Sequence, residues 1–546
     1  MGGILCLVSP PDCDGRRSFI PPHPLLQTTR VRFAGDRVAM VVAETLAAAR
    51  EAAELVLVRY RPLPAAVTPT AARAAGAPVH WEAVPDNTCY RYAEGDHEAT
   101  EQALDRADHV VRSQLIDNRM ITNFIEPRAA IGLHDAATDR FTLYTGTQMP
   151  HRVRASMAAA FARREGDFRV VVPVVGGSFG SKMSAYAEQA LVLWVARKLG
   201  RPVKWLAEKS EGFATDPAAR DNETVAELAL DHKGQFLSVR VSTLANMGGY
   251  LSNLTTQAPI NGLTLLSGPY AMQAGYAEVE GVFTNTVHTD VMRGAGRPEA
   301  TYALERLVDA AAQELDIPPD ELRRRNLIPA DAFPYTTAFG LSYDSGCFAS
   351  NLESALERAD WQGFGERRAA AKARGLLAGI AIGCYVQRNG GRLLDENAQI
   401  RIDPGGFSTL LIGTLDTGQG HETAYAQIMA ESLGLALDAI RVVERDTDVI
   451  GHGNGTGGSR SMMVGGSVTL LACRRIIDKG TAIAAHMLEV SGDDISFAAG
   501  RFAVSGTDRV VTLQEVARAA YRQDLLPAEI ETGLDERANF RPPNFS

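Results

Sequence analysis

The stretch FRVVVPVVGGSFGSKMSAYAEQALVLWVARKLG, residues 168–200, decides how this chain is interpreted. Residues 168–175 are rich in β-branched side chains and predict a strand, and residues 183–199 carry the apolar spacing of a helix. The loop Gly176–Lys182 lies between them. A strand that passes through a glycine-rich turn into a helix presents free backbone N–H groups and the positive end of the helix dipole, which suits an anion. The loop lacks both a Walker pattern and G-x-G-x-x-G, so an ordinary structural turn is an equal alternative.

The same construction returns three more times along the chain. RGAGR (293–297) precedes Pro298 and a helical pattern, with Pro placed as a first-turn residue. TGQGHE (417–422) follows the strand-like STLLIGTLD, and GTGGSRS (455–461) precedes a long apolar helix. Each loop alone is an ordinary turn. Four together predict several helix N-termini gathered around one large polyanionic ligand, with coincidence as the alternative.

The remaining pattern mixes helices and strands, so the expected fold class is α+β, with mixed α/β units. Residues 1–70 are expected to form a partial α/β domain in which residues 30–68 give a strand, an Ala-rich helix and a second strand. Residues 71–95 are expected to be a linker. Two larger domains, 96–333 and 334–546, meet near the turn-rich segment 334–346. Helices are expected over 98–107, 183–199, 299–315 and 351–373, and strands over 108–116, 141–146, 168–175 and 223–230.

Composition excludes several classes of protein. The 546 residues suggest three or four structural units, and a net charge of -10 without a basic run disfavours nucleic acid and acidic lipid as partners. The longest apolar run, 375–386, is too short to cross a bilayer. The first residues lack a signal-peptide pattern, so a cytoplasmic protein is expected. Six cysteines without a C-x-x-C pair exclude local zinc or iron–sulfur binding, and His421 and His452 lack partners at ligand spacing, so no metal ligand from the protein is expected.

Two further segments carry candidate polar groups. Gln148, just after a strand in TGTQMP, could donate its amide to a ligand oxo group, although an ordinary polar cap is the commoner role of such a residue. Glu126 and Arg128 in IEPRAA could form a local, solvated salt bridge. No G-x-S-x-G segment and no Ser/His/Asp or Cys/His arrangement supports covalent catalysis.

Taken in order, these segments resemble the large, molybdenum-binding subunit of the xanthine oxidase, aldehyde oxidase and carbon monoxide dehydrogenase family. The resemblance covers the chain from about residue 22 to its end and rests on the segments VRFAGDRVAMVVAETLAAAREAAELVLVRYRPLP, FIEPRAA, TGTQMP, VVGGSFGSK, FTNTVHTDVMRGAGRPEATYALERLVD, FGLSYDSG, DTGQGHETAYAQIMAESLG and GNGTGGSRS. It implies an α/β hammerhead domain over 1–70 followed by molybdopterin-binding domains over 96–333 and 334–546.

The resemblance also implies an activity and site residues. A molybdenum ion held by molybdopterin cytosine dinucleotide would hydroxylate a carbon centre with oxygen from water. Gln148, Phe179 and Arg293 would act at the reacting centre. The residues that would hold the cofactor are Gln148, Gly177, Ser178, Phe179, Gly180, Arg293, Gly294, Ala295, Gln419, Gly420, His421, Thr423, Ser459, Arg460 and Ser461. Electrons would leave through a small [2Fe-2S] subunit and a medium FAD subunit.

Three departures from the family pattern shape the expectation. Met183 stands where purine-oxidising members have a glutamate, and Gly294 stands where copper-containing carbon monoxide dehydrogenases have a cysteine, so the expected substrate is an aldehyde or an N-heterocycle. The family's base, a glutamate in a G-x-G-E segment, has no match after residue 461. Two interpretations stay open: a separate chain supplies that segment, or the chain is a truncated, catalytically incompetent fragment.

Overall fold

The computed structural model describes residues 2–4, 6, 8–11, 15, 17–390, 395–526 and 529–542. Its largest sheet has five strands in the order β1 (Thr88–Gly95), β11 (Ala274–Phe283), β10 (Phe236–Gly248), β9 (Asn222–Leu230) and β2 (His109–Asp117). Only β10 and β11 run parallel; the other neighbours are antiparallel. Helix α8 (Arg297–Glu314) packs on β2 and β9, and α3 (His97–Asp105) packs on β9, β10 and β11. A large apolar core fills this part of the molecule.

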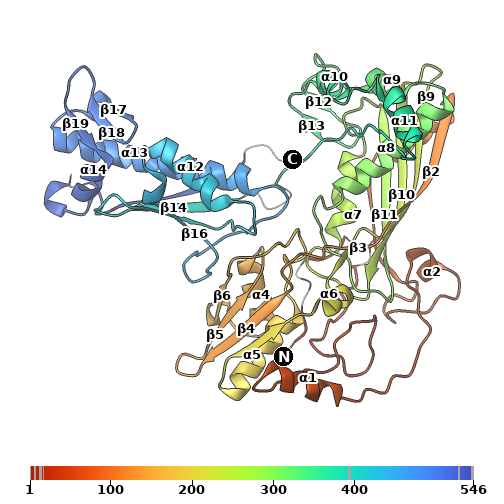
Figure 1. The fold of residues 1–546 in the computed structure, drawn as a ribbon, viewed down its shortest axis with the longest axis horizontal. Helices are drawn as coiled ribbons and strands as arrows, with labels where there is room; N and C mark the ends of the chain where they lie inside the picture. Colours follow the sequence, from red (N-terminus) through yellow and green to blue (C-terminus); the bar gives the residue numbers. More distant parts are fainter. Residues whose placement is uncertain are drawn as a thin grey trace.

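A second sheet has four strands, β6 (Phe168–Val171), β5 (Arg140–Thr145), β4 (Ala129–Asp135) and β7 (Val203–Leu206). It packs against α4 (Pro150–Phe161) and α5 (Ala187–Leu199) around a second core. Between the two sheets lie the pair β3 (Met120–Ile121) and β8 (Ala218–Ala219), and the short helices α6 (Lys209–Thr215) and α7 (Gln257–Asn261). This layout puts the ends of both sheets close to the loops singled out by sequence (Figure 1).

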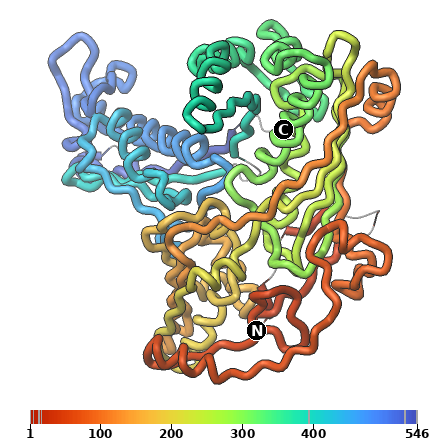
Figure 2. Tube along the Cα trace, turned by 45° about the vertical axis from the view of Figure 1, so that its right-hand side comes forward, coloured from red at the N-terminus to blue at the C-terminus, as the bar shows by residue number. Residues whose placement is uncertain are grey.

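The C-terminal part builds a third sheet in the order β16 (Ile440–Val443), β15 (Ser408–Ile412), β14 (Glu396–Ile402) and β20 (Leu534–Phe540). Helices α12 (His421–Leu433) and α13 (Ser467–Leu488) cover it, followed by β17 (Ile495–Ala498), β18 (Arg501–Val504), β19 (Val510–Thr512) and α14 (Leu513–Ala520). Residues after β16 reach the second sheet, because Val172 N donates to Arg445 O at 2.8 Å and Arg169 pairs with Asp446. Figures 1 and 2 both show this C-terminal part, in blue, beside the second sheet, which contains β4, β5 and β6.

A hairpin and two helices join the large sheet to the third one. They are β12 (Tyr335–Thr336), β13 (Ser342–Tyr343), α10 (Phe348–Arg358) and α11 (Phe364–Ala373), after α9 (Pro319–Asn326). The single helix expected over 351–373 is therefore wrong: the chain turns at Asp360, which has a φ of +46°. Residues outside the right-handed helical region interrupt the i to i−4 hydrogen bonds, so two helices form.

The expected N-terminal strands are also wrong. Helix α1 (Leu46–Glu54) forms as predicted and is capped by Thr45, but no strand is assigned to residues 30–43 or 55–68. These segments form no strand ladder with other described residues; their hydrogen bonds are isolated ones, such as Gln27 N to Arg37 O and Ala66 N to Asn285 Oδ1. Leu55 and Leu57 are 80% and 90% exposed. A strand is defined by its ladder, so β-type composition alone does not make one.

Three other expectations need correction. Residues 71–95 are not a bare linker, because α2 (Pro69–Arg73) begins just before them and β1 is an edge strand of the large sheet. Strand β6 ends at Val171 rather than Val175, since Pro173 has no N–H for a ladder. Helix α5 begins at Ala187 instead of residue 183, so Met183–Tyr186 separate the glycine loop from the helix.

Candidate active site

The four glycine-rich loops predicted from sequence do converge, and Gln148 lies where two of them meet. Its Oε1 accepts a hydrogen bond from Gly180 N at 2.8 Å, and its Nε2 donates to Thr456 O at 2.8 Å. The backbone is tied to both sides as well, since Gln148 N donates to Lys182 O and Thr456 N donates to Gln148 O. Gln148 is 5% exposed. It therefore joins the Gly176–Lys182 loop to the Gly455–Ser461 loop.

The other two loops attach to the first. Arg293 N donates to Phe179 O at 2.9 Å, and Ser178 Oγ donates to Thr417 Oγ1 at 3.1 Å. A Cβ added at Gly180 would lie 2.4 Å from Val291 O, so only glycine permits this approach. Loops far apart in sequence thus form one surface, as the sequence predicted; Ser178 and Thr417, for example, are 239 positions apart.

Several residues of this surface adopt left-handed backbone conformations that only glycine favours. Phe179, Ala295 and Ser459 have φ values of +49°, +46° and +60°. Such conformations cost free energy in residues with a Cβ, and they cluster at functional sites. The Phe179 ring is 49% exposed and lies over Gly177, where an added Cβ would be 3.0 Å from the ring. The strained Phe179 backbone is therefore held by the loop contacts described above.

The first loop is anchored by an ion pair that differs from the one predicted. Glu126 Oε2 accepts from Gly176 N at 2.8 Å and from the buried Lys182 Nζ at 2.8 Å. Arg128 does not pair with Glu126; it is 4% exposed and donates to Asp216 Oδ1 at 2.6 Å. The predicted Glu126–Arg128 bridge is wrong, because Glu126 pairs with Lys182 and Arg128 with Asp216.

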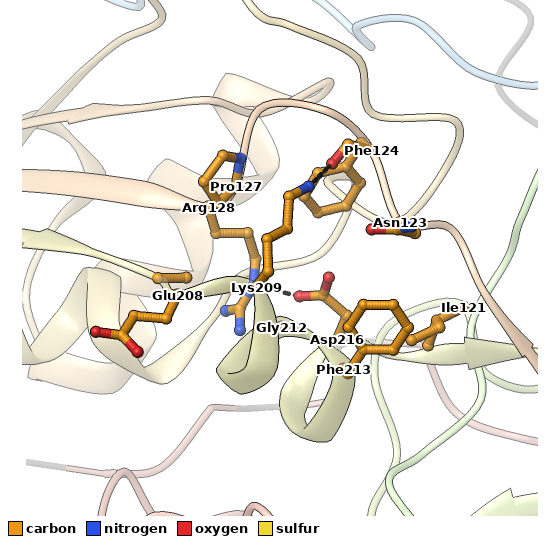
Figure 3. A pocket seen from close by; sticks show the side chains of 11 residues that line it. Ile121, Asn123, Phe124, Pro127, Arg128, Glu208, Lys209, Gly212, Phe213 and Asp216 are labelled. Carbon is orange, nitrogen blue, oxygen red and sulfur yellow. Dashed lines mark hydrogen bonds and ion pairs between the residues drawn. The ribbon is translucent and has the colours of Figure 1, made fainter.

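The Arg128 and Asp216 side chains line a small pocket below this loop (Figure 3). Its empty volume is about 280 Å³, and Lys209 Nζ within it donates to Phe124 O. Each of these charged groups already has a partner inside the pocket. We therefore assign the pocket a structural role in holding the turn between β3 and β4.

The Arg293 loop leads directly into α8. Gly296, with a φ of +92°, caps the helix, and Pro298 lies in its first turn as predicted. A Cβ at Gly294 would lie 2.3 Å from Pro298 Cγ, and Gly294 has a φ of +103°. A side chain at position 294 would therefore require the loop to move. The Arg293 carbonyl accepts from Arg220 Nη2 at 2.9 Å, which fixes the loop from behind.

The third loop satisfies its own amides. The Asp416 carboxylate accepts four backbone N–H bonds, from Gly418 and Gln419 on Oδ1 and from Gly420 and His421 on Oδ2. Burial raises the pKa of Asp416, but these N–H donors outweigh it and leave the pKa below its ordinary value. Sequence reasoning missed Asp416, although an aspartate directly before a turn at a helix start is a recognised capping signal.

The side chains of this loop face in two directions. His421 is buried, and burial lowers its pKa, so the imidazole is neutral near pH 7. Gln419 and Thr423 are exposed, and Gly418 and Gly420 have open space where a Cβ would lie. The outer edge of the loop is thus accessible to a ligand even though its amides point at Asp416.

The fourth loop holds a buried ion pair that sequence reasoning also missed. Arg460 Nη1 donates to Glu396 Oε2 at 2.8 Å, with the two side chains 1% and 0% exposed. Burial raises the pKa of Glu396, while Arg460 lowers it. Ser461 Oγ lies 2.9 Å from Thr456 Oγ1, and Ser459 is exposed. Of the three residues predicted to hold an anion here, Ser459 alone presents an exposed side chain.

One cation near Gln148 has an unused donor. Arg152, in the first turn of α4, has a buried Nη1 without a hydrogen-bond partner among the described residues, and it interacts electrostatically with the buried Asp290. Burial lowers the pKa of Arg152. Sequence reasoning did not single it out, although it is the second residue after TGTQMP. It is a further candidate for binding an anionic group.

The donor set fits a phosphate-bearing cofactor that brings its own metal. The groups at the converging loops are amides, hydroxyls and arginines, and the open glycines Gly418 and Gly420 leave room beside them. Within the described residues, no group of three or more His, Cys, Asp or Glu side chains could hold a metal ion. Nor is any described helix both long and apolar enough to cross a membrane.

Comparison with known families agrees with this donor set. Residues 79–327 and 354–546 each match a "molybdopterin cofactor-binding domain", and residues 1–64 match an "aldehyde oxidase and xanthine dehydrogenase, a/b hammerhead domain". The chain belongs to the molybdenum hydroxylase large subunits. It is a molybdopterin-dependent oxidoreductase of the xanthine dehydrogenase and carbon monoxide dehydrogenase family.

Three similar proteins show the breadth of this family. The carbon monoxide dehydrogenase large chain of Hydrogenophaga pseudoflava is 33% identical over 96% of this chain and 68% of its own length. The nicotine 6-hydroxylase large subunit of Paenarthrobacter nicotinovorans is 30% identical over 94% of this chain and 64% of its own. The crystal structure of quinoline 2-oxidoreductase from Pseudomonas putida 86 superimposes with a TM-score of 0.92 at 30% identity, covering 100% of this chain and 70% of that one.

Proposed function

We propose that this molybdenum hydroxylase subunit hydroxylates an aldehyde or an aromatic N-heterocycle with oxygen from water. The observation that carries the proposal is the environment of Met183. It is 8% exposed and packs with Met149, Ala258 and Val291, next to Ala295 of the Arg293 loop. An apolar wall favours a substrate without hydrogen-bonding groups on that side, whereas a purine needs polar partners there.

Carbon monoxide oxidation is the competing activity, because a carbon monoxide dehydrogenase is among the relatives. It would need a copper ligand, and glycine at position 294 offers none. The close approach of Gly294 to Pro298 supports the same choice, since a cysteine side chain would meet the proline ring.

The proposed cofactor is molybdopterin cytosine dinucleotide, which when bound supplies the molybdenum centre that transfers oxygen and accepts electrons. Gln148 is proposed to face the oxo group: its Nε2 carries two hydrogens, of which Thr456 O takes one. Phe179 and Arg293 would border the substrate. The remaining loop residues, Gly177, Ser178, Gly180, Gly294, Ala295, Gln419, Gly420, His421, Thr423, Ser459, Arg460 and Ser461, are proposed to surround the pterin and the nucleotide, with Arg460 acting through its support of the loop.

The proposed partners are a small [2Fe-2S] subunit and a medium FAD subunit. The large subunits to which this chain is similar belong to multi-subunit complexes, which supports partners of this general kind. Neither Glu126 nor Glu422 is proposed as the base, because Glu126 pairs with Lys182 and Glu422 with Arg445. We place that carboxylate outside these loops; a catalytically incompetent chain is the alternative.

The test is a substrate panel with the complex assembled in a cofactor-producing host. Aldehydes and quinoline-like heterocycles should be turned over faster than xanthine or carbon monoxide. Met183→Glu should lower kcat/KM for the heterocycle by at least about tenfold, because it places a carboxylate in an apolar wall. The control is Met462→Glu, at a methionine that is 51% exposed. Fastest turnover of xanthine or carbon monoxide would overturn the substrate assignment, and no turnover with bound molybdenum would favour the incompetent chain.

A further inference from the structure

A cavity with six polar lining residues lies behind the Arg293 loop, between the large sheet and helices α7 and α8. It is lined from β2, β9 and β10 on one side and from residues 259–266 and 296–303 on the other. The empty volume is about 470 Å³, part of it continuous with solvent. Most lining residues are apolar, and the polar ones are Asp117, Asn222, Thr224, Thr243, Glu299 and Tyr302.

Two buried acceptors of this cavity have no partner among the described residues. Asn222 is 6% exposed and its Oδ1 accepts no hydrogen bond. Glu299 Oε2 is likewise buried without a donor, while Oε1 accepts from Arg220 Nη1 at 2.8 Å. The Thr224 and Thr243 hydroxyls bond each other at 3.0 Å. Buried polar groups are nearly always paired, so these acceptors point to a ligand that brings positive charge or N–H donors.

The charges around the cavity do not balance. Asp117 and Glu299 are carboxylates, and Arg220 is the cation that faces both. Burial and the Glu299 charge raise the pKa of Asp117 while Arg220 lowers it, and the resulting pKa is about 6. Above that pH Asp117, Glu299 and Arg220 together carry one negative charge; Arg297, outside the cavity lining, also interacts with Glu299.

We propose that this cavity binds one monovalent cation, ammonium or potassium. The donors are oxygen atoms of two carboxylates, one amide and two hydroxyls, which are ligands for hard cations and acceptors for N–H groups. The single net negative charge of Asp117, Glu299 and Arg220 favours a monovalent ion over a divalent one. A divalent ion would leave an excess positive charge beside Arg220 in a partly buried site, which is unfavourable.

The occupant would act on the candidate active site through Arg220. That guanidinium bonds both Glu299 and the Arg293 carbonyl, and Arg293 N in turn donates to Phe179 O. Arg220 and Asp221 are both left-handed, with φ values of +63° and +66°, so this connection is held in a strained backbone. A cation bound to Glu299 Oε2 would therefore stabilise the position of the Arg293 loop through Arg220.

The experiment measures thermal unfolding and heat of binding on the complete chain at pH 8 and constant ionic strength. Choline chloride is replaced stepwise by ammonium, potassium, methylammonium or lithium chloride. Ammonium or potassium should raise Tm saturably, by about 2–4 °C once well above Kd, with one ion bound per chain. Saturation at lower ammonium than potassium would identify a hydrogen-bonding occupant, the reverse order a metal ion, and a comparable methylammonium effect an amine-bearing molecule.

Variants at the cavity make the assignment specific. Asp117→Asn removes the net negative charge and should abolish the cation-dependent rise, while Asp105→Asn, at an exposed carboxylate on α3, should keep it. At pH 5 the rise in the unaltered chain should shrink, because Asp117 is then protonated. Asn222→Leu is the second variant and should also lose the effect. An equal response to every salt, no response, or a rise that persists in both variants would overturn the proposal.

Discussion

The glycine-rich loops of residues 79–327 and those of residues 354–546 have similar sequences, but their polar groups find different partners. In the first half, Gly180 N and Arg293 N bond groups of other loops. In the second half, the amides before α12 bond Asp416, and Arg460 pairs with Glu396. The first loops are thus bonded to one another, with the Glu126 carboxylate as a further anchor at Gly176, whereas in the second half carboxylates of the same domain bond the positive groups.

Glycine and arginine patterns therefore predict where a loop lies, but they do not show whether its N–H groups and arginine side chains are free to bind a ligand. Asp416 lies within the same turn, but Glu396 is 64 residues from Arg460. A positive group that already has a buried carboxylate is a structural element first. Four substitutions test this difference between the two halves.

Arg460→Met should cause the largest loss. It would leave the Glu396 carboxylate buried without its counter-ion, which costs about 3–5 kcal/mol of unfolding free energy. Urea unfolding of the complete chain measures the loss. Arg441→Met, at an exposed arginine of β16, should stay within about 0.5 kcal/mol. A loss below 1 kcal/mol at position 460 would contradict the structural role and restore Arg460 as a free cofactor ligand.

Glu444→Gln should flatten the pH dependence of stability. Burial raises the pKa of Glu444 from 4.5 to about 7, although Asp416 N donates to it. The folded state then binds more protons than the unfolded state between pH 4.5 and 7, so stability falls by about 3 kcal/mol as pH rises through this window and levels off above it. The unfolding free energies at pH 5 and pH 8 should differ more in the unaltered chain than in the variant, which keeps only the contribution of groups such as Asp117. Equal slopes in both chains would refute this assignment.

Asp416→Asn should loosen only the turn before α12. The asparagine has one acceptor oxygen for four N–H groups, and losing charge-assisted bonds costs about 1.5–3 kcal/mol. The pKa of Asp416 in the folded protein is below its ordinary value. The ionised carboxylate therefore stabilises the fold at any pH above that ordinary value, and this stabilisation is lost only as the pH falls through the folded-state pKa. Its effect should therefore be the same at pH 5 and pH 8, unlike that of Glu444.

Hydrogen exchange at residues 418–421 measures the loosening directly. Asp403→Asn is a matched control, because Asp403 caps an exposed turn by accepting from Gly405 and Phe407. Protection at 418–421 that survives in Asp416→Asn would show that another group holds these amides.

Phe179→Gly should have the smallest effect on stability and separate stability from function. Glycine relieves the left-handed strain, worth about 1 kcal/mol, and so offsets the lost ring contacts. Turnover and molybdenum content should fall nonetheless. Ala162→Gly, at the left-handed end of α4, should give the same relief without affecting molybdenum content. A strongly destabilised Phe179→Gly would mean that the ring, and not the backbone position, holds the loop.

The elements with local signals could be predicted closely. Helix α8 begins two residues before the expected start, and Pro298 lies in its first turn. Helix α3 and strands β2, β5 and β9 lie within one or two residues of their predicted ranges. The predictions fail where a neighbouring strand determines the structure. Residues 55–68 have the composition of a strand but no partner strand among the described residues, and β1 forms because β11 lies beside it.

The site shows the same division. The four loops and the family could be predicted from the sequence, because glycine spacing and loop order are local and ordered signals. The roles of Gln148, Phe179 and Arg293 at the reacting centre stay a prediction. Three features could be found only in the folded structure. Gln148 joins two loops, and the Asp416 and Glu396 carboxylates accept hydrogen bonds from N–H groups of the other two. Among the described residues, Arg152 Nη1 has no hydrogen-bond partner. The physical reason is that a polar group's partner depends on which buried atoms lie within about 3 Å, and the chain brings those atoms together from positions hundreds of residues apart.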